Sequence, residues 1–227
     1  MKAPFSAYLS GIRNGAEELV RLLRIKYEYV SVLATDSCGF AVRISQRARS
    51  VSSETMTTER GLVVRVCRGR QYSEVSLNHF DASHPEDAAA EVEAEVEKQR
   101  TLLSSLGINA YDTPILPDEP MTLFTEKECE VLPEETDMKA LVESLTALSD
   151  RAMARSSELL DCVLTAQSTH ICKLFLTENR NLAQSYVYSE GTVIAIASRD
   201  GRTQTGYEGL SGLGGSELFA ALGEKME

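Results

Sequence analysis

The amino-acid sequence predicts an α+β protein of two halves, each with a helix and antiparallel strands, the second half being a β-meander. Apolar residues recur at helical spacing in two segments, 5–27 and 137–156. Runs that alternate or are rich in Val and Ile are joined by short turn signals rather than by helices. Four of the six prolines lie between Pro114 and Pro133, and this shift in composition marks the boundary between the halves.

The N-terminal half is predicted to begin with an amphipathic helix over residues 5–27. Its apolar residues that share one face are Leu9, Ile12, Ala16, Leu19 and Leu23. Strands are predicted over 29–34 and 40–45, separated by a turn at 36–39. The alternating run 61–69 predicts a third strand, which turns at Gly69 and Arg70 into a hairpin partner.

The second predicted helix carries signals at both ends. Ser83 followed three residues later by Glu86 fits a capping box, with Pro85 in the first turn. Gly107 is suited to the residue just after the helix. The acidic first half of this helix, 86–97, is interpreted as a solvated face.

The second half is predicted to hold a helix over 137–156 and then five short strands. These strands cover 161–167, 169–178, 182–189, 191–199 and 202–209. They are separated by predicted turns at Ser168, 178–181, 190–191 and 200–201. The Asp200–Gly201 pair is the strongest hairpin signal. The sequence thus predicts an N-terminal domain over 1–112, a Pro-rich acidic linker over 113–136, and a central domain over 137–227.

Composition restricts the class of protein. Apolar residues make up 43% and charged residues 25% of the 227, as in soluble globular proteins. The net charge of −11 argues against a nucleic-acid footprint over the whole protein. No apolar run is long enough for a membrane span, and the first residues lack the apolar segment of a secretory signal. We therefore predict a cytoplasmic protein.

The five cysteines contain no C-x-x-C pair, and most have apolar neighbours. This pattern favours reduced thiols in the core, with a disulfide between Cys162 and Cys172 as the alternative. The three histidines do not have the spacing of a helical zinc site: His79 and His84 flank a helix start, and His170 alternates with Cys172 in a strand. We therefore expect neither a metal site nor a set of catalytic residues.

Glycines near the end of the sequence could suggest a phosphate-binding loop. They are Gly206, Gly209, Gly212, Gly214 and Gly215. No Lys-Ser/Thr pair follows them, and no parallel βαβ unit contains them. A flexible or closely packed connection is the simpler interpretation.

Seven arginines lie between residues 43 and 70, a segment that contains only two glutamates. Among them, Arg65, Arg68 and Arg70 are candidates for contact with a polyanion or an acidic partner. The alternative is that they lie on the outer face of a sheet and pair with acidic helices of the same molecule.

Two stretches give the sequence a resemblance to a known family. "ERGLVVRVCRGRQYSEVSLNHF" resembles a strand pair in which a Gly-x-x-x-Arg-Val strand turns through a Gly. "FLTENRNLAQSYVYSEGTVIAIASRDGRTQTGYEGLSGLGG" resembles a segment with an S-x-G turn, here Ser189 to Gly191, and an x-D-G-x-x-Q turn, here Asp200 to Gln204. Both are similar to the N-terminal portion of the TldD/PmbA family, the modulators of DNA gyrase regarded as zinc metallopeptidases.

The resemblance implies that this chain is the N-terminal region of a metallopeptidase that acts on unfolded peptides. In the family, a His-Glu-x-x-x-His motif and a later cysteine bind zinc beyond the matched region, so no ligand or catalytic residue is carried onto this sequence. Zinc is expected only in a full-length member, and the region alone is expected to be inactive. It would shape the substrate cleft and the contacts of a homo- or heterodimer. The alternatives are a non-catalytic partner subunit and a binding module that meets protein or nucleic acid through its arginine-rich strands.

Overall fold

The computed structural model describes residues 1–108 and 111–226, and it confirms the α+β class. The strands are β1 (Tyr29–Ile44), β2 (Arg49–Ser52), β3 (Arg60–Arg68), β4 (Gln71–Leu77), β5 (Met121–Glu126), β6 (Leu159–Leu176), β7 (Arg180–Arg199) and β8 (Arg202–Leu213). The helices are α1 (Ala7–Arg24), α2 (Pro85–Ser105) and α3 (Met138–Met153), with 3₁₀ segments η1 (Pro133–Glu135) and η2 (Ser216–Met226). None of the helices in these ranges is long and apolar enough to cross a membrane.

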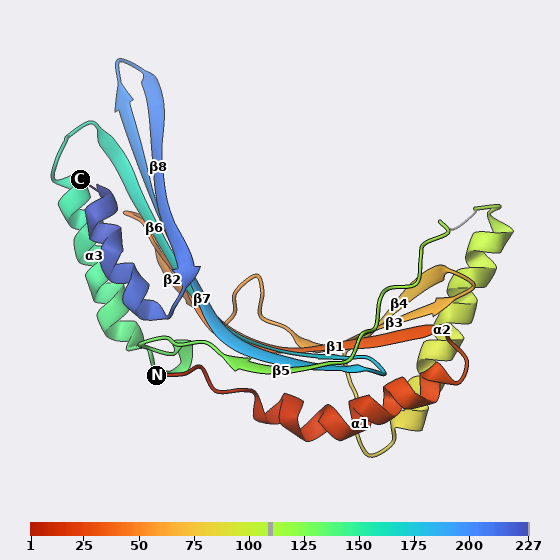
Figure 1. Ribbon diagram of the computed structural model, residues 1–227. Coiled ribbons are helices and arrows are strands. Elements are labelled where there is room, and N and C mark those ends of the chain that lie inside the picture. Colours follow the sequence, from red (N-terminus) through yellow and green to blue (C-terminus); the bar gives the residue numbers. More distant parts are fainter. Residues whose placement is uncertain (109–110, 227) are drawn as a thin grey trace.

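All eight strands form one bent sheet in the order β4-β3-β1-β6-β7-β5, and β2 and β8 pair with β1 and β7. Every pairing is antiparallel except that between β5 and β7, which is parallel. The last three long strands, β6 to β8, form the predicted meander. Figure 1 shows α1, α2 and α3 along the outer side of the bend.

The pairing of β1 with β6 joins the N-terminal part of the chain to the later part. It extends from Val32 opposite Leu176 to Ile44 opposite Leu164. The segment 113–136, predicted as a linker, contains β5 and η1. The sheet therefore includes strands from all three predicted regions, and the proposed domain limits stay a prediction.

Three of the predicted turns are wrong, because the strands continue through them. The turns expected at 36–39, at Ser168 and at 190–191 lie inside β1, β6 and β7. They occur side by side in the sheet, where Phe40 pairs with Ser168 and Ser168 pairs with Ser189. Figure 1 shows the long strands bending in their middle. Small residues that resemble turn signals allow close approach here instead, since a Cβ on Gly39 would lie 2.2 Å from the Ser168 carbonyl oxygen.

The two hairpin turns are confirmed. Gly69 and Arg70 connect β3 to β4, and Asp200 and Gly201 connect β7 to β8. All four residues have positive φ angles between 52° and 76°. Positive φ at both central residues is the geometry that two-residue hairpins require.

The helix ends mostly follow local signals. Ser6 and Asp137 cap α1 and α3 by accepting hydrogen bonds from backbone N–H groups. The predicted capping box of α2 is wrong: the N-cap residue is His84, without a side-chain cap bond, and Ser83 instead donates its N–H to Asp81. Gly107 follows the end of α2 with φ +64°, as predicted.

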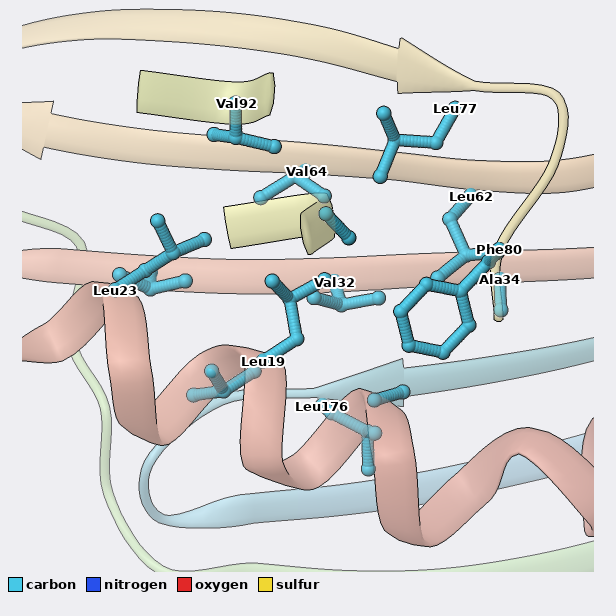
Figure 2. Close-up of a cluster of buried hydrophobic side chains, with 14 of the residues drawn as sticks. Leu19, Leu23, Val32, Ala34, Leu62, Val64, Leu77, Phe80, Val92 and Leu176 are labelled. Carbon is cyan, nitrogen blue, oxygen red and sulfur yellow. The ribbon is translucent and has the colours of Figure 1, made fainter. Parts of the chain in front are cut away.

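Two apolar cores lie on the same face of the sheet. The first joins α1 and α2 to the sheet through residues such as Leu19, Leu23, Val64 and Val92 (Figure 2). The second packs α3 and η2 on the other end of the long strands, around Leu164. β1 and β6 each contribute residues to both cores, so the same two strands connect the two ends of the molecule.

Two glycines of α1 give a matched test of the first core. We expect Gly11→Ala to stabilise the protein by about 0.5–1 kcal/mol, because Gly11 is exposed with nothing within 4 Å of an added Cβ. Gly15→Ala should instead destabilise it by about 1–3 kcal/mol, because the Cβ would lie 2.6 Å from backbone atoms of Ala82. Urea denaturation measures both. Equal stabilisation by the two variants would contradict this packing.

Candidate functional site

A polar band crosses the helix-facing side of the sheet between the two cores. On β1 and β6, every second residue points to this face, from Val30 to Ile44 and from Cys162 to Leu176. The residues at both ends of each of these two ranges are apolar and buried. The middle positions are polar or sulfur-bearing: Asp36 and Cys38 on β1, Ser168, His170 and Cys172 on β6, and Ser185 and Ser189 on β7. Polar residues thus lie side by side on three neighbouring strands, between two apolar cores. Such a group is a candidate site, because buried polar groups need hydrogen-bond partners.

Residues 127–136, here called the strap, cover this band. Lys127 donates its N–H to the Ser185 carbonyl at 2.8 Å, and the N-terminal amine donates to the Cys129 carbonyl at 2.6 Å. Glu217 accepts hydrogen bonds from the N–H groups of Glu130 and Val131 at 3.2 and 3.1 Å. The strap is thus fixed on the sheet by contacts with both ends of the chain.

The strap brings Glu134 against two residues of the band, and we call Cys38, Glu134 and His170 the polar cluster. Cys38 and His170 are direct partners in the β1–β6 register. The Cys38 Sγ lies 3.0 Å from Glu134 Oε1, and His170 Nδ1 lies 2.8 Å from the same oxygen. His170 is buried, whereas Cys38 and Glu134 are exposed. Solvent therefore reaches the cluster from one side.

The second nitrogen of His170 faces the interior. Ser185 Oγ donates to the Pro4 carbonyl at 3.1 Å, because a carbonyl can only accept. The hydroxyl therefore accepts from His170 Nε2–H, at 2.9 Å. Cys172 Sγ lies 3.6 Å from Nε2 and 3.3 Å from Ser185 Oγ. These contacts fix the ring so that Nδ1 points towards Glu134.

The electrostatics of the polar cluster favour a charged pair next to a neutral thiol. Burial by itself raises the pKa of Glu134, but hydrogen bonds with His170 and Cys38 outweigh it and lower that pKa to about 2. Burial lowers the pKa of His170, but hydrogen bonds with Cys172, Cys38 and Glu134 raise it to about 12. The hydrogen bond with His170 lowers the pKa of Cys38, yet burial and Glu134 together raise it.

This arrangement differs from that of a cysteine nucleophile. In a Cys-His-acid triad, the thiol and the orienting group contact opposite ring nitrogens. Here one oxygen of Glu134 contacts both the Cys38 Sγ and Nδ1, and the pKa of Cys38 is raised rather than lowered. The geometry is that of converging donor atoms, not of an activated thiolate.

The arginines singled out from the sequence lie elsewhere, and each has an acidic partner. Arg65 pairs with Glu74, Arg68 with Glu97 at 3.2 Å, and Arg70 with Asp112 at 2.9 Å. All six side chains are substantially exposed. Contact of these arginines with a polyanion stays a prediction. Of the three pairs, only that of Arg68 is with a helix, as the alternative interpretation expected, because Glu97 lies on α2 whereas Glu74 lies on β4.

The other histidines and the glycine run do not join the site. His84 contacts Asp81, three residues before it. Gly215 packs against the strap, where a Cβ would lie 1.6 Å from the Val131 carbonyl oxygen. Sequence reasoning missed the polar cluster because Cys38 and Glu134 lie 96 residues apart. The only local signal was the alternation of His170 with Cys172 on one strand face.

One strand edge is open beside the site. β5 ends the order of the sheet, and Leu123 and Phe124 on it are each 55% exposed. By contrast, the segment after α2 covers β4. The N–H of Thr113 donates to the Arg70 carbonyl, and the Tyr72 hydroxyl accepts a hydrogen bond from the N–H of Leu116. An open edge with exposed apolar side chains is suited to pairing with another strand.

No protein-family model and no curated protein sequence matches this chain. Solved structures do match. A candidate modulator of DNA gyrase from Bacteroides thetaiotaomicron has a TM-score of 0.70 and 12% identity, covering 97% of this chain and 49% of that one. TldE from Thermococcus kodakarensis has a TM-score of 0.60 and 9% identity, covering 87% and 42%. A candidate modulator of a DNA gyrase from Thermotoga maritima has a TM-score of 0.60 and 13% identity, covering 88% and 42%.

At these identities the likeness establishes the fold. The chain has the fold found in proteins described as modulators of DNA gyrase and as TldE, which is the fold that the TldD/PmbA resemblance implied. It spans about half the length of these structures.

The exposure of the cysteines gives a direct check of the site. All five are free, and only Cys38 is exposed. We expect one thiol of the native chain to react with dithionitrobenzoate, more slowly than a free thiol because its pKa is raised, and five to react after unfolding. Cys38→Ser should abolish the reaction of the native chain, whereas Cys67→Ala, at a buried position, should leave it. Reaction of two or more thiols in the native chain would contradict the burial of the remaining four.

Proposed function

We propose that this chain is the N-terminal region of a TldD/PmbA-like metallopeptidase that acts on unfolded peptides. The region shapes the substrate cleft and the subunit contacts of a homo- or heterodimer. The observation that supports this best is the match along 97% of the chain to a candidate gyrase modulator about twice as long. The match extends over both cores and the strap, so it favours a common fold in the two proteins rather than a single short motif that both contain.

The open edge of β5 supports a role in holding extended chains. An extended peptide that adds to a sheet edge is bound through its backbone, so such binding tolerates many sequences. The exposed side chains of Met121, Leu123 and Phe124 supply apolar contacts beside that edge. A peptide or a strand of a partner subunit would use the same surface.

Catalysis is proposed to need residues other than these 227. No His-Glu sequence occurs in the chain, so the zinc motif of the family's peptidases has no counterpart here. Purified 1–227 should therefore release no new termini from a labelled unstructured peptide, with or without a chelator. Hydrolysis by 1–227 that a chelator stops and zinc restores would overturn this assignment.

The β5 edge can be tested with a pair of matched variants. Leu123→Lys should weaken binding of a fluorescent unstructured peptide about tenfold or more, because one apolar contact is lost and a charge is added. Leu102→Lys on α2 is the control, since Leu102 is 58% exposed but lies on a helix. Fluorescence anisotropy measures both affinities. Equal effects of the two substitutions would show that binding does not use this edge.

A further inference from the structure

The polar cluster has the composition of a transition-metal site. It offers one sulfur, one imidazole nitrogen and one carboxylate oxygen, and all three atoms lie within 4.8 Å of one another. Zinc in proteins is bound by these three donor types, usually four-coordinate. Sulfur and nitrogen donors are poor ligands for Ca²⁺ and Mg²⁺, so a hard cation does not fit.

The tautomer of His170 supplies a second argument. With Nε2–H donated to Ser185, neutral His170 turns the lone pair of Nδ1 towards Glu134. The Nδ1 atom and the Glu134 oxygen lie 2.8 Å apart and converge on one position, which a ring proton or a metal ion can occupy. In the free protein a second proton on the ring takes this position, and a metal ion would replace that proton. Donation of the other ring N–H to a fixed acceptor is typical of histidines that bind metals.

The three donors are also held in place before any ion binds. Cys38 and His170 are opposite each other in paired strands, and Gly39 allows those strands their close approach. Glu134 is held by η1, which is followed by Thr136 bonded to the Leu132 carbonyl and to Ser216. Donors on rigid elements lose little conformational freedom when they bind an ion.

We propose that Cys38, Glu134 and His170 bind one Zn²⁺ ion through Sγ, a carboxylate oxygen and Nδ1. Donor atoms of a tetrahedral zinc site lie about 3.3–3.8 Å apart, so the hydrogen-bonded atoms would separate by less than about 1 Å. Binding releases the thiol proton of Cys38 and the Nδ1 proton of His170 to solvent. The thiolate and the carboxylate then balance the two positive charges.

The fourth position of this site would face solvent, because Cys38 and Glu134 form its exposed side. A water molecule or a donor from a bound peptide completes the coordination there. The site uses none of the residues that the family's zinc motif would supply, and it lies within these 227 residues. Its existence is therefore independent of the proposed peptidase function.

The test is zinc binding by untagged, metal-stripped 1–227 in competition with a chromophoric zinc indicator. We expect one ion per chain. Cys38→Ser and Glu134→Gln should each weaken binding by about tenfold or more, because each removes one of three ligands. Glu135→Gln is the matched control, since Glu135 is the next exposed carboxylate of η1 and lies outside the cluster. Because Glu134 is exposed, Glu134→Gln should fold normally, and its circular dichroism spectrum should match that of the parent.

Two further readouts identify the ligands without any activity assay. Co²⁺ in place of zinc should give a thiolate charge-transfer absorption that Cys38→Ser removes and Glu135→Gln keeps. Zinc should also protect Cys38 from dithionitrobenzoate. The proposal is overturned if the parent chain takes up no stoichiometric zinc, if Cys38→Ser and Glu134→Gln bind it as the parent does, or if Glu135→Gln loses it equally.

Discussion

The long antiparallel pairing of β1 with β6 is the constraint on which the rest of the structure depends. It places residues near the beginning of the chain beside residues more than a hundred positions later, in a continuous register from Val32–Leu176 to Ile44–Leu164. Each strand shows one face to two separate sets of helices. Because the side-chain period of a strand is two, a slip of one residue would move the apolar residues of both cores to the opposite face.

The bend in these strands explains why the polar band lies where it does. Helices pack against the sheet on either side of the bend, and among the described residues it is the strap and the N-terminal segment that cover the face between them. Small residues allow the strands to approach there, as at Gly39, and their polar neighbours bond to one another, as Ser189 does to Ser168 at 2.7 Å. The same local geometry therefore provides both the curvature of the sheet and the group of donor atoms.

Sequence patterns predicted the parts of the fold that local physics determines. Periodicity located α1 and α3, and glycine-containing turn signals located the hairpins at Gly69 and at Gly201, where the φ angles are positive. The failures came where distant contacts override a local signal. Ser168 and its neighbours are typical of a turn, but pairing on both sides keeps them extended. The polar cluster could not be predicted, because its donors come from three segments that only the β1–β6 register and the strap bring together.

The fastening of the strap also sets an order of assembly. The N-terminal amine holds it at Cys129, while the carboxylate of Glu217 holds Glu130 and Val131. β3, β4 and α2 follow one another along the chain and are made early. The strap, by contrast, has an anchor at Glu217, 86 residues beyond Val131. The covering of the polar cluster, the group of residues with the most chemistry in this molecule, therefore includes a contact that can form only after Glu217 has been synthesised.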